Sequence, residues 1–198
     1  MNFKKRGGYV GNKAPTREEA FELLKKYTKS ESLINHALAV EAVMIHFAEL
    51  LGEKDIEKWG IIGLVHDLDY EMYPEEHCKI TKKILEEENW PEEYIHAIMS
   101  HGWKICTDVE PIEKMEKVLY TIDELTGLVN ATALMRPTGI SDMKVKSLKK
   151  KWKDKSFAAG VNRAVIAEGA EMLGMELNEV FSETIEAMKN VAEEVGLQ

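Results

Sequence analysis

The chain has 198 residues, of which 44% are hydrophobic and 31% charged, a composition that excludes a disordered protein and is typical of a soluble globular one. Its length suits one domain, or one domain with an extension. The formal net charge of −9 argues against general binding to nucleic acids, which relies on clustered positive charge.

The first residues, MNFKKRGGYVGNK, lack the apolar region of a secretory leader, and no apolar run approaches the roughly 20 residues of a membrane span. Cys78 and Cys106 share no C-x-x-C spacing, so we expect two reduced thiols. These features predict a cytoplasmic protein that does not enter a membrane.

Helical spacing begins after the glycine-rich start, and we interpret residues 1–15 as a flexible tail. Thr16 and Glu19 have the spacing of a capping box ahead of the apolar run AFELLKKY. Ser30 then opens a second helix, whose apolar stripe has helical spacing and ends at Gly52.

The next segment, IEKWGIIGLVHD after Asp55, is apolar nearly all round and predicts a buried central helix. Pro74 and Pro91 each begin a further helix, with the proline at or near the first turn. A longer helix follows Pro111 and is broken by the sequence RPTGIS, which contains Pro137.

Two or three helices follow this break, and no alternating pattern of useful length predicts a strand. The predicted fold is therefore all-α. We expect residues 16–136 to form a helical domain and residues 137–198 a C-terminal helical extension packed on that domain.

Histidines and acids recur at apolar positions of these helices. Such residues are His36, His66, Asp67, His77, His101 and Asp123. A buried acid costs several kcal/mol unless it is paired or bound to a metal. One or two shared divalent cations would offset this cost, and a mixed imidazole and carboxylate set suits Fe, Mn, Co, Ni or Zn better than Ca.

The order of these residues resembles that of a known family. The segments INHALAVEAV, GLVHDLD and VLYTIDEL are similar, over roughly residues 30 to 130, to the H…HD…D pattern of the HD-domain metal-dependent phosphohydrolases. The resemblance implies an HD-type helical bundle, and a first metal held by four ligands. These ligands are His36, His66, Asp67 and Asp123, and Asp67 would be able to bridge to a second metal.

Members with two metals carry two additional histidines between the doublet and the last aspartate. The segments EEHCKITKKIL and AIMSHGW look like those parts of the family, which implies His77 and His101 as ligands of a second ion. The gap from Asp67 to His77 is shorter than in many two-metal members. His46 and His96 are excluded, because neither is expected on the face of its helix that carries a ligand.

The resemblance implies hydrolysis of a phosphate ester or anhydride, of a nucleotide or a similar small metabolite, by a metal-activated hydroxide. We assign catalytic roles to Asp67 and Asp69. Asp69 would orient the attacking water or hold a ligand histidine; a solvent-exposed acid at a helix end is the alternative.

A basic segment lies on this acidic chain, because residues 144–163 hold seven lysines and one arginine against one aspartate. The residues assigned here to the substrate phosphates are Arg136, Lys149, Lys150 and Lys153. A solvated helix face is the alternative interpretation of this segment.

Two other functions stay open at this point. A few relatives with two irons look like oxygenases that cleave carbon bonds with dioxygen, and the ligands alone do not separate the two chemistries. A nucleotide-binding sensor without catalysis is the third hypothesis, with the basic C-terminal region as its output surface. The expected partner is a small phosphorylated substrate, with neither membrane nor general nucleic-acid binding, and a homodimer is left open.

Overall fold

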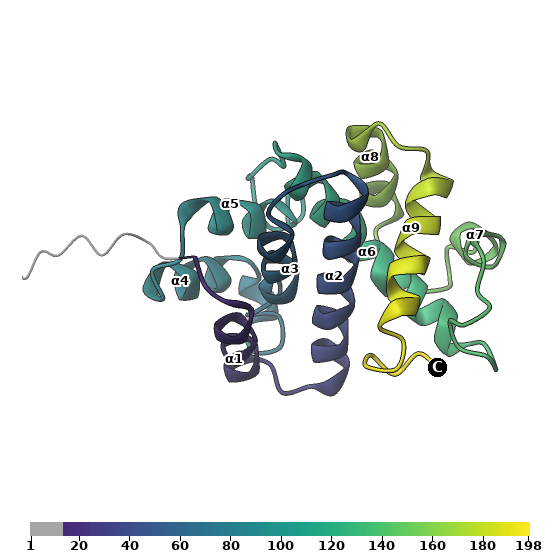
Figure 1. Cartoon of the computed structure of the whole chain (residues 1–198), viewed down its shortest axis with the longest axis horizontal. Helices are drawn as coiled ribbons and strands as arrows, with labels where there is room; N and C mark the ends of the chain where they lie inside the picture. Colours follow the sequence, from purple (N-terminus) through teal and green to yellow (C-terminus); the bar gives the residue numbers. More distant parts are fainter. Residues whose placement is uncertain (1–13) are drawn as a thin grey trace, which may run out of the picture.

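The computed structural model describes residues 14–198, and the helices of this part form a bundle around α2 and α3 (Figure 1). The elements are α1 (Arg17–Tyr27), α2 (Glu31–Leu50), α3 (Ile56–Val65), the 3₁₀ helix η1 (Pro74–Glu76), α4 (Lys79–Glu87), α5 (Glu92–Ser100), α6 (Lys114–Leu134), α7 (Val145–Lys153), α8 (Arg163–Leu173) and α9 (Leu177–Asn190). The described part contains no named strand, so the all-α prediction is confirmed. The tail predicted over residues 1–15 lies outside the described residues, apart from Ala14 and Pro15.

The predicted helix starts agree with the local hydrogen bonds. Thr16 and Glu19 form the capping box: the Glu19 N–H donates to Thr16 Oγ1 at 3.2 Å, and the Thr16 N–H donates to Glu19 Oε2 at 2.8 Å. Asp55 caps α3 by accepting the Lys58 N–H at 3.4 Å. Each cap of this kind stabilises a helix by about 0.5–2 kcal/mol relative to alanine.

α3 is the buried central helix that its composition predicts, since every residue from Trp59 to Val65 is buried. It packs closely on α2, and Gly63 lies at the crossing. A Cβ at Gly63 would lie 2.9 Å from Met44 Cγ and 3.1 Å from the Val40 carbonyl oxygen, so only glycine allows this approach. The close crossing brings the C-terminal end of α3 next to α2.

The helix predicted to begin at Pro74 is interrupted. η1 ends at Glu76, α4 begins only at Lys79, and Cys78 between them has φ +68°. A residue in this left-handed region cannot continue an α-helix. His77 therefore lies in a sharp break, and not in the first turn of a continuous helix as predicted.

By length and mean hydropathy α2 could cross a membrane, which the sequence prediction had overlooked. Half of its apolar span is buried inside the bundle, where α2 packs on α3, α6 and α9. Such burial is typical of the core helix of a globular protein.

The three helices after residue 137 pack on the earlier ones. α8 lies on α6, and α9 lies on both α2 and α6, with Phe181 and Ile185 buried. Arg163 fixes the segment between α7 and α8, because its guanidinium donates to backbone carbonyl oxygens of this segment, including that of Phe157 at 2.7 Å.

Candidate metal centre

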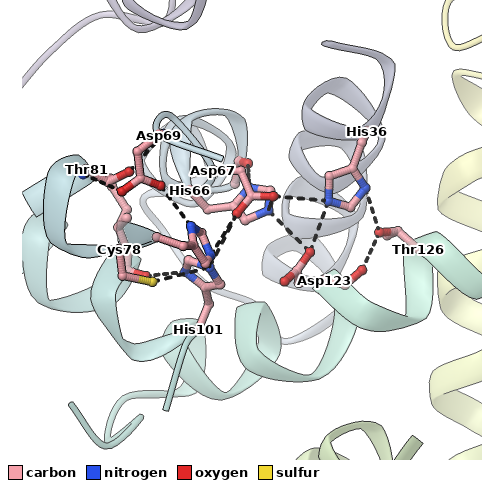
Figure 2. A network of polar contacts seen from close by, with 12 residues as sticks. His36, His66, Asp67, Asp69, Cys78, Thr81, His101, Asp123 and Thr126 are labelled. Atoms are coloured by element: carbon pink, nitrogen blue, oxygen red, sulfur yellow. Dashed lines mark hydrogen bonds and ion pairs between the residues drawn. The ribbon is translucent and has the colours of Figure 1, made fainter. Parts of the chain in front are cut away.

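Four side chains from α2, α6 and the end of α3 meet in the interior (Figure 2). One ligand atom from each lies within 4.8 Å of all the others; the residues are His36, His66, Asp67 and Asp123. Asp123 Oδ1 lies 3.0 Å from His36 Nε2 and 3.3 Å from His66 Nε2. Asp67 Oδ2 lies 3.4 Å from His66 Nε2. We call these four residues the first ligand set.

A second group of three adjoins the first and shares Asp67 with it. Asp67 Oδ1 lies 3.4 Å from His77 Nε2 and 3.5 Å from His101 Nε2, and these two nitrogen atoms are 3.1 Å apart. Asp67, His77 and His101 are the second ligand set. The two oxygen atoms of one carboxylate thus face different sets, which is the arrangement of a bridging ligand.

The other ring nitrogen of each histidine is occupied, which fixes the direction of Nε2. Nδ1 of His66 donates to the Gly63 carbonyl oxygen at 2.8 Å, and Nδ1 of His101 donates to the Ile98 carbonyl oxygen at 2.5 Å. In His77, Nδ1 is 2.8 Å from Asp69 Oδ1. Hydrogen bonds of this kind select the tautomer whose Nε2 lone pair is free to bind a metal.

His66 Nε2 tests whether these residues fit a cation. The side chain is fully buried, yet Nε2 makes no hydrogen bond of acceptable geometry with any described residue. A buried polar atom without a partner costs about 1–3 kcal/mol, so such atoms are rare. A cation coordinated by this nitrogen and by the neighbouring carboxylates removes the cost, and the residues therefore fit a metal.

The charges of the first set reinforce one another. Burial by itself would lower the pKa of His66, but the charges of Asp67 and Asp123 raise it well above its ordinary value of 6.5. Burial would likewise raise the pKa of Asp123, whereas the neighbouring His66 and the hydrogen bond from His36 lower it well below its usual range. Without a metal, a protonated imidazole thus takes the place of the cation.

Asp69 is buried, and both of its carboxylate oxygens are occupied (Figure 2). Oδ1 accepts from His77 Nδ1, and Oδ2 accepts from the Thr81 N–H at 2.7 Å. Burial would raise the pKa of Asp69, but these two hydrogen bonds lower it. The alternative of a solvent-exposed acid at a helix end is therefore wrong, and the geometry favours the role of holding a histidine.

A cavity of about 520 Å³ opens over both sets, and His36, Asp67, His77, His101 and Asp123 line it. Its wall also includes Tyr70 and Glu124, and Ala158, Gly160 and Val161 from the segment before α8. The Glu124 carboxylate accepts the Asn162 N–H at 2.9 Å and so connects this segment to the residue beside Asp123. Among the described residues that line the cavity, none is lysine or arginine.

The basic residues assigned to substrate phosphates do not line this cavity, so its geometry gives that assignment no support. Arg136 holds the turn after α6, where it donates to the Gly139 carbonyl oxygen at 3.1 Å and to Asp142 at 2.5 Å. Lys149, Lys150 and Lys153 line a separate groove of about 940 Å³ beside α9. The local run of charge did not reveal which way α7 faces.

The two excluded histidines lie outside both sets. His46 pairs with Glu183 of α9 at 2.7 Å, and His96 pairs with Glu116 of α6 at 2.7 Å. His46 is therefore half-buried between α2 and α9.

Sequence reasoning missed the contacts behind the ligands. Thr126, three residues after Asp123, lies 3.5 Å from His36 Nδ1, and Thr81 holds Asp69. The helical spacing of Thr126 from Asp123 was a usable signal. The contact of Cys78 with Cys106 left no signal in the sequence. The two free thiols are far apart along the chain, and their sulfur atoms lie 2.9 Å apart only in the fold.

In a comparison with protein families, residues 33–128 match a family model described as "HD domain". The matched segment begins before His36 and ends after Asp123, so it contains both ligand sets. Neither the curated proteins nor the solved structures include a match to the chain.

Proposed function

Residues 33–128 match the HD-domain family, and from this premise we propose that the chain hydrolyses a phosphate ester or anhydride of a small metabolite such as a nucleotide. Members of this family are generally metal-dependent phosphohydrolases. One observation carries the proposal: the Asp67 carboxylate lies between two ligand sets, with Oδ2 towards His66 and Oδ1 towards His77 and His101.

The residues present would hold one divalent cation in the first set and a second in the set that shares Asp67. A bound divalent cation supplies a water molecule of lowered pKa and withdraws charge from a phosphoryl oxygen. Asp67, on the cavity wall, would orient the attacking water as a hydrogen-bond acceptor. Asp69 acts as a positioning residue, because both of its oxygens are already bound to His77 and Thr81.

The cavity supports a small anionic substrate whose charge is met mainly by the cations. The absence of lysine and arginine from its described lining leaves only the two ligand sets as a place for positive charge. Tyr70 and Val161 offer an aromatic and an apolar surface for the part of the substrate that carries no charge. A volume of about 520 Å³ lies in the range of small-molecule sites, about 300–1,000 Å³.

The test is phosphate release by chelator-treated protein that is reloaded with Mn, Fe, Co, Ni, Zn or Mg in turn. Nucleotides and simple phosphate monoesters are assayed under nitrogen and, in parallel, in air. Hydrolysis that requires a transition-metal ion supports the proposal. Turnover that requires iron and dioxygen would instead support an oxygenase, and nucleotide binding without turnover under every ion would support a sensor; either result contradicts the proposal.

Two variants make the assay specific for the bridging carboxylate. Asp67→Asn keeps the volume of the side chain and removes its charge, so phosphate release should fall by at least about 100-fold, as expected for an altered metal ligand or its support. Glu183→Gln makes the same chemical change in a carboxylate that pairs with His46, outside both ligand sets. It should leave the activity unchanged.

A further inference from the structure

The two cysteines of the chain meet beside the second ligand set. Cys78 Sγ lies 2.9 Å from Cys106 Sγ, although the residues are 28 positions apart. A disulfide has an S–S distance of about 2.0 Å, so a small approach of the two sulfur atoms would be enough to form the bond.

The backbone around both residues allows this contact. Cys78 has φ +68°, a conformation that non-glycine residues rarely adopt, and its side chain is fully buried. Gly102 lies against both sulfur atoms, and a Cβ there would collide with each of them. A left-handed cysteine and a glycine without space for a side chain thus bring the two sulfur atoms together.

The two thiols differ in access. Cys106 is half-buried and lines the metal cavity. It also lines a second cavity of about 480 Å³, between Pro74 and Asp108, which includes Lys79 and Lys104. Cys78 has no exposed surface. A small oxidant therefore reaches Cys106 first, and Cys78 lies behind it.

We propose that Cys78 and Cys106 are a redox-active pair that hydrogen peroxide converts to a reversible intramolecular disulfide. The Cys106 sulfur attacks one peroxide oxygen, the O–O bond breaks, and a sulfenic acid and one water are formed. The Cys78 sulfur then displaces the hydroxyl group of the sulfenic acid, which leaves as a second water with the thiol proton. Two thiols lose two electrons in total, and one peroxide is reduced to two waters.

The bond would restrain the second ligand set. Cys78 directly follows His77, and Cys106 lies in the turn that follows His101. Cys78 Sγ is also 3.9 Å from His101 Nε2. A disulfide between them therefore links the backbone next to His77 to the turn after His101. It also closes a loop in the unfolded chain, which lowers the entropy of the unfolded state and so stabilises the fold.

The experiment uses the full chain after treatment with a chelator, so its result does not depend on the hydrolase proposal. After one equivalent of hydrogen peroxide, the count of free thiols should fall from two to none, and a thiol reductant should restore both. A non-reducing peptide map should contain a single cross-linked species that joins Cys78 to Cys106 within one molecule. The unfolding temperature of the oxidised protein should exceed that of the reduced protein.

Single variants separate the reaction of Cys106 with peroxide from the formation of the disulfide by Cys78. In Cys78→Ala, Cys106 should stop at the sulfenic acid, which dimedone traps. In Cys106→Ala, the remaining buried thiol should react with peroxide at least tenfold more slowly. Circular dichroism verifies the fold of each, and the wild-type peptide map decides the matter if a variant does not fold. Two unreacted thiols, separate oxidation of each cysteine without a cross-link, or cross-links only between molecules would each overturn the proposal.

Discussion

Asp69 holds His77 in place: its buried Oδ1 lies 2.8 Å from Nδ1 of that imidazole. The opposite ring nitrogen, Nε2, is the one that faces Asp67 and His101. Because η1 and α4 leave His77 in a break between helices, its ring has no regular helix of its own to fix it. Asp69 supplies that constraint.

Asp69→Asn should therefore weaken the second cation more than the first. An asparagine presents only one oxygen, so either His77 Nδ1 or the Thr81 N–H must face an amide N–H₂ group. We expect the affinity of the second ion to fall about 10–100-fold and the protein to lose about 1–3 kcal/mol of unfolding free energy. Calorimetric titration with Mn or Co measures the first effect and denaturant unfolding the second.

The same titration of Glu183→Gln is the control, because that carboxylate also binds a histidine, His46, but outside the ligand sets. Equal affinities of Asp69→Asn and wild type for both ions would show that Asp69 does not position His77.

A rise in pH should lower the stability of the metal-free protein and increase its affinity for the metal. With a raised pKa, protonated His66 stabilises the fold fully below about pH 6.5, and this contribution is lost as the pH rises through the raised value. A cation requires the neutral imidazole, so its affinity increases with pH over the same range. Asp123 has a lowered pKa and stays charged there, so it adds no slope.

The difference in unfolding temperature between metal-loaded and chelator-treated protein should therefore widen from about pH 6 to about pH 9. His46→Gln should behave like the wild type, because His46 belongs to neither ligand set. A difference that stays constant or narrows would contradict the role assigned to His66.

Gly63→Ala should separate α3 from α2. The added methyl group meets Met44 and the Val40 carbonyl oxygen, so the two helices must move apart. Overpacking of this kind costs about 1–3 kcal/mol of unfolding free energy, and the displacement of His66 from His36 should also weaken the first cation. Thermal unfolding with and without Mn measures both effects.

Gly127→Ala is the matched control, since it also replaces a helical glycine. The new Cβ would lie at an ordinary 3.8 Å from Val161. We expect a gain of about 0.5–1 kcal/mol, the usual preference of a helix interior for alanine. Destabilisation by both variants alike would show that the close crossing at Gly63 is not the cause.

The lysines of α7 should not contribute to turnover. Lys149, Lys150 and Lys153 line a groove that is separate from the metal cavity. A triple variant with glutamine at these positions should keep the wild-type kcat/KM at every salt concentration tested. The opposite result would be a lower kcat/KM of the variant at low salt, together with a similar decrease of the wild-type kcat/KM at high salt. That result would indicate electrostatic steering of the substrate by these residues.

The helices and the cluster were largely predictable because their signals are local. The capping residues Thr16 and Asp55 mark helix starts, and the apolar surroundings of His66 and Asp123 mark these residues as side chains that need a buried partner. His77 was placed in a helix because Pro74 is a common first-turn residue, whereas the left-handed backbone of Cys78 leaves no mark in the sequence.

Contacts between distant segments were not predictable from one sequence. The orientation of α7 depends on how it packs on α6 and α9, and a run of lysines does not encode that packing. The contact of Cys78 with Cys106 likewise exists only once α4 and the turn after α5 have come together.

The hydrogen bond between Glu124 and Asn162 bears on which molecules can enter the cavity. The hydrogen bond between them holds Ala158 and Val161 against the cavity, and these residues lie beyond residues 33–128, which match the family model. The two ligand sets thus lie within the segment that matches the family model, whereas one part of the cavity wall comes from a later stretch of the chain. A different segment after α6 would change the shape of the cavity beside the same two ligand sets, and with it the molecules that the cavity admits.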